Sequence, residues 1–305
     1  MEIWGPVLTA MVTPFKADGQ LDLPGAARLA RHLLDSGSDG LVVCGTTGEG
    51  AVLSLDERLA VWDVVLEAVG DRGPVWASTG SYDTAATAAA SRAAARAGAI
   101  GLLVVTPYYN KPPQDGLFRH FAQVASATDL PIMLYNVPSR TSVNMHAATT
   151  LRLAREVPTV RGIKEAHGDL GQVADLLRDR PSGFRVLSGD DGLTFALVAM
   201  GGDGVVSVAS HLAGREIGAM IAALRRGDLP IAAALHLDLV PLVRALFHTT
   251  SPIPLKAALA LLDLPAGPPR PPLYPASDGE REVVRRALEA FATARGAQRA
   301  ASSAS

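Results

Sequence analysis

Eight short apolar runs recur along this chain, and each is followed by a longer segment whose apolar residues have helical spacing. The runs are Val7–Val12, Gly40–Cys44, Val75–Ser78, Gly101–Thr106, Ile132–Tyr135, Val160–Lys164, Arg185–Ser188 and Gly204–Val208. Because they lack polar alternation, they are typical of parallel strands covered on both faces. Eight such strand–helix units favour an α/β fold of the (β/α)8 TIM-barrel type. An open doubly wound sheet is the main alternative, but it seldom contains eight regular units.

After Arg226 the pattern of apolar runs stops. Three helices are predicted there, at Leu229–Phe247, Leu255–Leu262 and Ser277–Thr293, and prolines separate them. We therefore expect a barrel with the active site at residues 1–226 and a C-terminal helical extension at 227–296. The small and polar residues 297–305 are expected to be a disordered tail.

Charge and cysteine content argue against several function classes. A net charge of −2 gives no basic surface for nucleic acid or an anionic membrane. No uncharged apolar stretch reaches the length of about 18 residues that spans a bilayer, and no secretory signal pattern opens the chain. The single cysteine, Cys44, is expected in a buried strand, so a disulfide within the chain is excluded. These features predict a cytoplasmic protein without nucleic-acid or membrane partners.

Polar residues gather where the apolar runs end, and a barrel of this type carries its active site at those ends. Of the five tyrosines in the chain, three lie at such positions. The candidates are Thr46, Thr47, Tyr108, Tyr109, Tyr135, Arg140, Lys164 and Gly189.

Lys164 is the candidate nucleophile. The other lysines are Lys16, Lys111 and Lys256, and arginine supplies the remaining positive charges. An arginine cannot lose its proton, whereas a desolvated lysine amine attacks a ketone to give a Schiff base. The pKa of a free lysine is about 10.4, and burial at a barrel mouth is expected to lower it. The plainer interpretation is that Lys164 is a surface lysine in an arginine-rich chain.

The neighbouring candidates suit imine chemistry. Tyr135 can pass protons while remaining neutral, and the hydroxyls of Thr46 and Tyr109 can extend that relay. The turn Gly45–Gly48 offers N–H groups to a small carboxylate, because its glycines let the backbone approach closely. The planar guanidinium of Arg140 matches a second carboxylate.

Structural interpretations exist for the same features. Two threonines in a glycine-flanked turn are often only a turn, and Tyr108 fits aromatic packing at a subunit interface better than catalysis. Asp190 and Asp191 stand where a helix begins, and capping of that helix is the favoured interpretation. The seven histidines show no metal-ligand spacing, so no metal site is predicted.

Three segments, Gly45–Glu49, Tyr135–Thr141 and Gly162–Ala166, together resemble the motifs of the dihydrodipicolinate synthase family. The likeness extends from Thr13–Phe15 to Pro252–Lys256 in the expected order and spacing. Members of this family are (β/α)8 lyases and aldolases that bind pyruvate as a lysine imine, often as tetramers of tight dimers. The resemblance implies no metal or organic cofactor, a pyruvate substrate and a homotetramer.

The resemblance also implies the catalytic roles. Lys164 matches the Schiff-base lysine, and Tyr135 matches the proton donor and acceptor. Thr46 and Tyr109 match the relay, with Tyr109 expected to reach into the active site of a neighbouring subunit.

Substrate-binding positions follow from the same resemblance. Thr47 and Val206 match positions that bind pyruvate, and Arg140 matches the residue that receives the carboxylate of L-aspartate 4-semialdehyde. Gly189 is a further candidate for substrate binding. The implied reaction joins pyruvate to that aldehyde and closes a ring, on the route to diaminopimelate and lysine.

Two other functions stay open. Family members that cleave sialic acid or 2-keto-3-deoxy sugar acids resemble this chain in the lysine and the tyrosine, but usually lack an arginine where Arg140 stands. A carboxylate-bearing aldehyde needs such a cation, so the condensing reaction is favoured. A catalytically silent relative that serves as a sensor or assembly partner is the more remote alternative, because no member of the implied catalytic set is missing.

Positions that resemble the family's lysine-feedback site predict weak or absent inhibition by lysine. Tyr108 is kept, but Tyr82 and Ala86 stand where feedback-sensitive members carry an asparagine and a glutamate. Leu55 and Arg58 replace histidines. Ala86 offers no acceptor for the ammonium group of a bound lysine.

Overall fold

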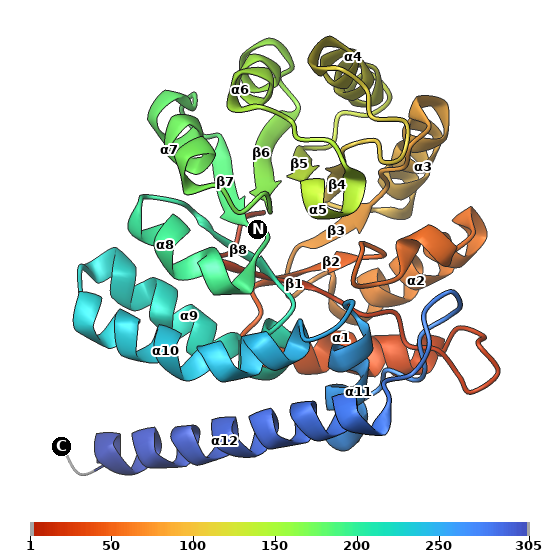
Figure 1. The fold of residues 1–305 in the computed structure, drawn as a ribbon. Coiled ribbons are helices and arrows are strands. Elements are labelled where there is room, and N and C mark those ends of the chain that lie inside the picture. The colour runs from red at the N-terminus through yellow and green to blue at the C-terminus, as the bar shows by residue number, and fades with distance from the viewer. Residues whose placement is uncertain (1–2, 304–305) are drawn as a thin grey trace.

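The computed structural model describes residues 3–303, and its strands close into a single parallel barrel (Figure 1). The strands are β1 (Val7–Ala10), β2 (Gly40–Val43), β3 (Val75–Ser78), β4 (Gly101–Val105), β5 (Ile132–Asn136), β6 (Val160–Glu165), β7 (Arg185–Ser188) and β8 (Gly204–Ser207). Neighbours in sequence pair in parallel, and β8 closes the barrel on β1. Each strand coincides with one apolar run of the sequence, so the predicted (β/α)8 barrel is confirmed.

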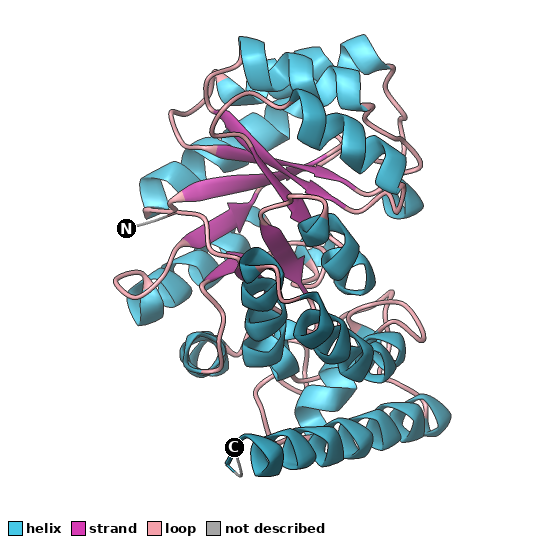
Figure 2. Ribbon diagram, turned by 90° about the vertical axis from the view of Figure 1, so that its left-hand side faces the viewer, coloured by secondary structure: helices cyan, strands magenta, loops and turns pink. Residues whose placement is uncertain are grey.

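Helices surround the barrel, as Figure 2 shows from the side. They are α1 (Leu23–Asp35), α2 (Leu55–Val69), α3 (Thr84–Ala97), α4 (Gln114–Ala125), α6 (Ala147–Glu156), α7 (Leu170–Asp179), α8 (Thr194–Ala199) and α9 (Ser210–Arg226). Side chains fix several starting points: Ser54 and Glu57, for example, form a reciprocal capping box at the first turn of α2. Short turns also occur in the loops after β2, β5 and β7, namely η1 (Gly50–Val52), α5 (Pro138–Thr141) and η2 (Asp191–Leu193).

Strand side chains alternate between two apolar layers. One layer fills the barrel and includes Leu8, Trp76, Met133, Leu187 and Val206. The other layer lies between the barrel and the helices. Because successive strand residues point to opposite sides, Tyr135 and its partner on β6, Lys164, share the inner side.

The C-terminal extension consists of α10 (Leu229–Leu246), α11 (Ile253–Leu261) and α12 (Asp278–Ser303). In Figure 1 these helices lie against one side of the barrel, near α1 and α9. The structure thereby confirms that a helical extension follows the barrel.

The last helix, α12, enters the segment 297–305, for which a disordered tail stays a prediction. The helix continues to Ser303, because alanine, glutamine and arginine favour helix and no glycine or proline interrupts residues 297–303. The last two residues of the expected tail lie outside the described residues.

One described helix, α10, is long and apolar enough to cross a membrane by length and composition alone. It packs along α9 and α12. Its side chains Ala232, Leu239 and Leu242 are buried in those contacts. They belong to the interior of the folded chain.

Candidate active site

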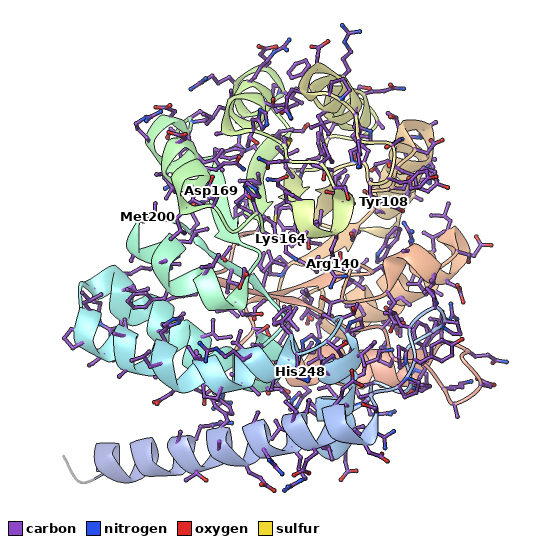
Figure 3. All side chains as sticks on the ribbon, viewed as in Figure 1. Tyr108, Arg140, Lys164, Asp169, Met200 and His248 are labelled. Carbon is purple, nitrogen blue, oxygen red and sulfur yellow. The ribbon has the colours of Figure 1, made fainter. Side chains whose placement is uncertain are left out.

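A cavity of about 360 Å³ opens at the carboxyl ends of the strands. Figure 3 shows Lys164 and Arg140 at this end of the barrel, beside α5. The cavity is lined by six of the eight residues to which a catalytic or substrate-binding role was assigned, namely Thr46, Thr47, Tyr135, Arg140, Lys164 and Gly189. Residues far apart in the sequence thus meet in one hollow, as the positions of the strand ends predict.

Lys164 and Tyr135 face each other across neighbouring strands. Their Cα atoms are register partners between β5 and β6. The ammonium nitrogen of Lys164 lies 4.2 Å from the centre of the Tyr135 ring, within the range of a cation–π attraction. Only 4% of Lys164 and 5% of Tyr135 is exposed. An amine and a phenol are therefore held together away from bulk water.

Gly189, after β7, makes room for the lysine stem. A Cβ atom at this position would lie 3.1 Å from both Cγ and Cε of Lys164, and 2.7 Å from Cβ of Ala166. Any side chain here would therefore push Lys164 away from its observed position. The role of Gly189 in this geometry is to leave space rather than to offer a polar group.

The turn from Cys44 to Glu49 carries Thr46 and Thr47. Both end residues are left-handed, with φ of 59° at Cys44 and 54° at Glu49, a region that non-glycine residues rarely occupy. The hydroxyl of Thr13 donates to the carbonyl of Gly48 at 2.6 Å, which ties the turn to the loop after β1.

Cys44 is buried, as predicted, and burial raises the pKa of its thiol to about 12. The sulfur therefore stays protonated at neutral pH and does not compete with Lys164 as a nucleophile.

Two guanidinium groups line the cavity. Arg140 follows Pro138 in the short α5 turn, and its Nη2 donates to the carbonyl of Ser251 at 3.3 Å. Arg244 reaches the same cavity from α10. The sequence interpretation missed Arg244, because this residue lies within a helix of the extension and no strand-end pattern marks it.

A buried polar network lies on the outer side of the strands that carry Tyr135 and Lys164. Asn136 donates to Glu165 at 3.0 Å and to Asn144 at 2.8 Å, and Gln172 donates to Glu165 at 2.9 Å. Burial raises the pKa of the Glu165 carboxyl, while these donors oppose that rise. The network joins β5 and β6 to the loops that follow them. The sequence analysis did not identify it.

The favoured capping interpretation is correct for Asp190 and wrong for Asp191. Asp190 accepts from the N–H of Gly192 at the start of η2. Asp191 is buried and accepts from the N–H groups of Val208 and Ala209, and from the Ser207 hydroxyl. Its carboxylate satisfies donors of the loop after β8, which short-range sequence patterns cannot reveal.

Two predicted residues lie outside the cavity. Val206 is 1% exposed in the apolar interior of the barrel, and Val208 lines the cavity in its place. Tyr109 is 89% exposed, with a left-handed φ of 71°. It is not among the residues that line the cavity of its own chain.

A second cavity, of about 300 Å³, adjoins the first and shares Thr46, Tyr135 and Arg140 with it. Tyr108 lines this second cavity and packs edge-on against Tyr82, with ring centres 5.4 Å apart. Tyr108 thus has an aromatic partner within the chain, and its packing at a subunit interface stays a prediction.

Among the residues that the structure describes, no group of three or more His, Cys, Asp or Glu side chains is placed to bind a metal ion.

Comparisons with known proteins agree on one family. The model of the dihydrodipicolinate synthetase family matches residues 4–291. A protein of Moorella thermoacetica named 4-hydroxy-tetrahydrodipicolinate synthase is 54% identical over 286 residues, which cover 94% of this chain and 98% of that protein.

Solved structures give the same result. A dihydrodipicolinate synthase of Cyanidioschyzon merolae with bound lysine has a TM-score of 0.94 and 43% identity, covering 96% of this chain and 99% of that one. A monomeric dihydrodipicolinate synthase variant has a TM-score of 0.93 and 42% identity, covering 95% and 97% of the two chains. The similarity to this family therefore covers nearly the whole chain, including most of the C-terminal extension.

Proposed function

This chain belongs to the dihydrodipicolinate synthetase family, and we propose that it condenses pyruvate with L-aspartate 4-semialdehyde to give 4-hydroxy-tetrahydrodipicolinate. The observation that carries the proposal is the buried pair of Lys164 and Tyr135 in a cavity that Arg140 also lines. The proposed place of the reaction is the cytoplasm, on the route to diaminopimelate and lysine.

The first half of the reaction builds a carbon nucleophile. The Lys164 amine attacks the ketone carbon of pyruvate to give a carbinolamine, and loss of water gives the imine. Tyr135 supplies and removes the protons, with Thr46 and Tyr109 as the relay. Loss of a proton from C3 of the imine then gives an enamine, because the protonated imine nitrogen accepts the electron pair. The proposed chemistry therefore needs no metal or organic cofactor.

The second half joins the two substrates. The enamine carbon attacks the aldehyde carbon, whose oxygen becomes a hydroxyl group, while Arg140 binds the carboxylate of the aldehyde substrate. The substrate amine then attacks the imine carbon and displaces the Lys164 amine as the ring closes. One water molecule leaves overall, and the enzyme regains its free lysine.

Pyruvate binding is proposed for the turn after β2. Thr47 is buried in the wall of the cavity, next to the exposed Thr46. Gly189 and strand β8, which carries Val206, complete the proposed pocket. Val208, in the loop after β8, lines the cavity. A small carboxylate suits a turn of this kind, which offers backbone N–H groups and threonine hydroxyls as donors.

Arg140 favours this reaction over cleavage of a sugar acid. In the described part of the chain its guanidinium forms a hydrogen bond to the Ser251 carbonyl and has no ion pair with a carboxylate. A planar cation at the rim of the cavity suits a substrate carboxylate, whereas a polyhydroxylated chain needs neutral hydrogen-bonding partners.

Borohydride trapping with pyruvate, followed by peptide mapping, tests the proposal when turnover of aspartate semialdehyde is assayed on the same preparation. We expect the label on Lys164 together with turnover. In Lys164→Arg, which keeps the charge, the label should vanish and kcat should fall by on the order of 10³-fold or more. The exposed Lys16 provides the control, since Lys16→Arg should behave as the unmodified protein.

The alternative functions give different results in the same experiment. Label on Lys164 without turnover of the aldehyde, together with release of pyruvate from a 2-keto-3-deoxy sugar acid or sialic acid, would identify an aldolase. Absence of label would contradict imine chemistry at this site and leave a silent ligand-binding relative.

Weak or absent inhibition by lysine is also proposed. Tyr82 and Leu55 are exposed, and Ala86 has no polar atom in its side chain for an ammonium group. Arg58, which donates to the Gly50 carbonyl at 2.6 Å, would repel that group. Inhibition by sub-millimolar lysine in the turnover assay would contradict this proposal.

A further inference from the structure

The turn that carries Thr46 and Thr47 is fastened to the C-terminal extension through Glu49. The Glu49 side chain is 1% exposed, and its Oε1 lies 2.6 Å from the amine of Lys256 on α11. Its Oε2 accepts the backbone N–H of Arg270 at 2.8 Å. Both carboxylate oxygens are therefore bound by residues that follow in sequence more than 200 positions later.

The extension residues are themselves fixed in place. The Lys256 amine is 2% exposed, donates to the carbonyl of Pro268 and lies 4.3 Å from the centre of the Phe15 ring. The Arg270 guanidinium lies at the same distance from the centre of that ring. Both cations thus contact the ring of Phe15, which follows β1. These contacts restrain their positions.

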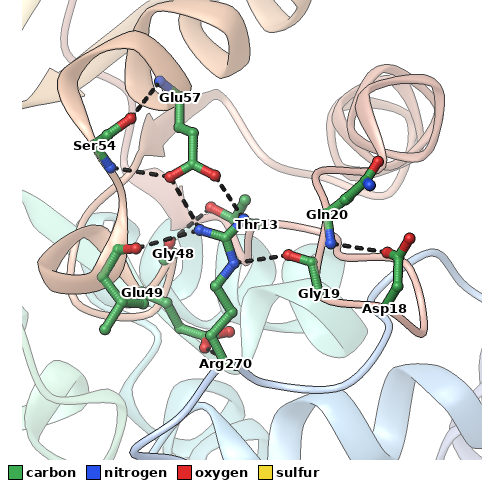
Figure 4. Close-up of polar contacts among 10 residues, drawn as sticks. Thr13, Asp18, Gly19, Gln20, Gly48, Glu49, Ser54, Glu57 and Arg270 are labelled. Atoms are coloured by element: carbon green, nitrogen blue, oxygen red, sulfur yellow. Dashed lines mark hydrogen bonds and ion pairs between the residues drawn. The ribbon is translucent and has the colours of Figure 1, made fainter.

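Arg270 adds a second point of attachment. Figure 4 shows its guanidinium between Glu57 of α2 and the carbonyl of Gly19. The same group also donates to the carbonyl of Val52, at the end of η1. The strands β1 and β2 and the helix α2 are thereby connected to one segment of the extension.

We propose that Glu49 is a positioning residue for the catalytic turn, and that Lys256 and the Arg270 backbone hold it, so that the C-terminal extension sets the geometry of Thr46 and Thr47. Two facts support this role together. The turn has a left-handed, non-glycine residue at each end, Cys44 and Glu49. This conformation persists only where surrounding contacts enforce it. The contacts at Glu49 come from outside the barrel and are buried.

An apolar pair could fill the space that Glu49 and Lys256 occupy, so burial alone does not explain why the pair is charged. A buried ion pair is often no more stable than an apolar pair of similar volume, although loss of one partner leaves an unpaired buried charge. Its value here is directional, because a carboxylate with an ion pair at one oxygen and a backbone N–H donor at the other is held in one orientation. That orientation defines where the backbone of the turn lies.

This inference rests on the proposed function, since it concerns the positions of groups that are proposed to serve pyruvate and its imine. The decisive variant is the double substitution Glu49→Gln with Lys256→Met, which removes both charges and leaves none unpaired. The single variant Lys256→Met is measured beside it. The readouts are the melting temperature, kcat, KM for pyruvate and the rate at which borohydride traps the imine.

We expect Lys256→Met to lower the melting temperature and the double variant to recover most of that loss. The rate of imine trapping should stay about 10- to 100-fold below that of the unmodified protein in both variants, because the turn is no longer oriented. If Lys256→Met does not fold, the double variant alone carries the comparison.

Arg180→Met is the matched control. Arg180 pairs with Asp203 at the opposite end of the barrel, so its loss should affect stability and leave imine trapping unchanged. A double variant that recovers both its melting temperature and its trapping rate to within about twofold would overturn the inference and show a purely stabilising pair. Absence of trapping in the unmodified protein would instead contradict the proposed function, so the two failures are distinguishable.

Discussion

At the scale of single residues, the placement of Lys164 depends on a position that has no side chain. Gly189 lies against the lysine stem, and a Cβ atom at this position would meet Ala166 as well as Lys164. The observed position of the lysine stem opposite Tyr135 therefore requires that position 189 has no side chain. Precise placement matters because a shift of about 1 Å at a reacting group can cost about 100-fold in rate.

Gly189→Ala should lower kcat and the rate of imine trapping by about 10- to 100-fold, because the new methyl group would meet Cγ and Cε of Lys164 at 3.1 Å. Gly189 is not in the positive-φ region, but the new methyl group would also meet Cβ of Ala166 at 2.7 Å, so the melting temperature is measured beside the two rates to separate a loss of stability from a displaced Lys164. Steady-state kinetics and trapping check this expectation. Gly218→Ala is the control, because a Cβ there meets only Val7, at 3.9 Å, and it should leave both rates unchanged.

Placement in the cavity was predictable for residues at strand ends, whereas their catalytic roles stay predictions. Thr46, Tyr135 and Lys164 each follow directly from an apolar run, and parallel strands bring their ends together. Val206 is two residues away from the cavity-lining Val208, because the sequence does not reveal how deeply β8 enters the barrel. Arg244 lies in a helix whose angle to the barrel depends on packing, so no local pattern indicates it.

At the scale of elements, a histidine joins the loops after β1 and β8. His211, in the first turn of α9, is 1% exposed. Its Nε2 accepts from the N–H of Val12 at 3.2 Å, which leaves Nδ1 to donate to the Val208 carbonyl at 2.9 Å. This arrangement requires a neutral ring. Burial accordingly lowers the pKa of His211 to about 4.

The free energy of unfolding should therefore fall as the pH falls from about 6.5 to about 4. A histidine whose pKa is lower in the folded state stabilises the folded protein fully at pH values above its unfolded pKa. This stabilisation is lost as the pH falls toward its folded pKa. For His211 the expected loss between pH 7 and pH 4.5 is about 2 kcal/mol. His120, whose burial also lowers its pKa to about 4, adds to the slope in the same range.

Urea unfolding at both pH values measures this slope. His211→Gln keeps a donor and an acceptor but does not titrate, so its slope should be smaller than that of the unmodified protein. The exposed His146 serves as the control, because His146→Gln should not change the slope. An unchanged slope in His211→Gln would show that this ring is not the titrating group.

Element prediction was most accurate for strands and least accurate for helix ends. Each strand lies within a residue or two of its apolar run, because a buried parallel strand needs an uninterrupted apolar segment. Helix ends depend on side-chain caps and on what the helix packs against. Thus α8 begins only at Thr194, since Asp190 caps the preceding η2 turn, and α12 extends to Ser303.

At the scale of the whole molecule, barrel and extension both contribute residues to the candidate active site. Ser251, between α10 and α11, accepts from Arg140, and Lys256 pairs with Glu49. The sequence predicts that an extension exists, because its strand pattern ends at Arg226. Contacts between residues this distant depend on the completed fold, so no spacing rule could identify these partners.

The exposure of Tyr109 leads to a prediction about assembly. Its side chain is 89% exposed and lines neither cavity of its own chain, although a relay role is proposed for it. If a partner subunit completes the relay, each site combines Lys164 of one chain with Tyr109 of the other. Lys164→Arg then damages the site of its own chain, and Tyr109→Phe damages the site of the neighbouring chain. In a mixed dimer, one site combines an intact Lys164 with an intact Tyr109 from its neighbour.

Mixing equal amounts of the two inactive variants, after dissociation and reassembly, should therefore restore about a quarter of the unmodified activity, because half of the dimers are mixed and each has one intact site. Turnover of aspartate semialdehyde measures the recovery, and light scattering measures the mass of the assembly. Unmixed Tyr109→Phe, treated in the same way, should stay at its low rate. Mixed dimers without recovered activity would mean that Tyr109 acts within its own chain, since every mixed dimer would then contain one lesion in each of its sites.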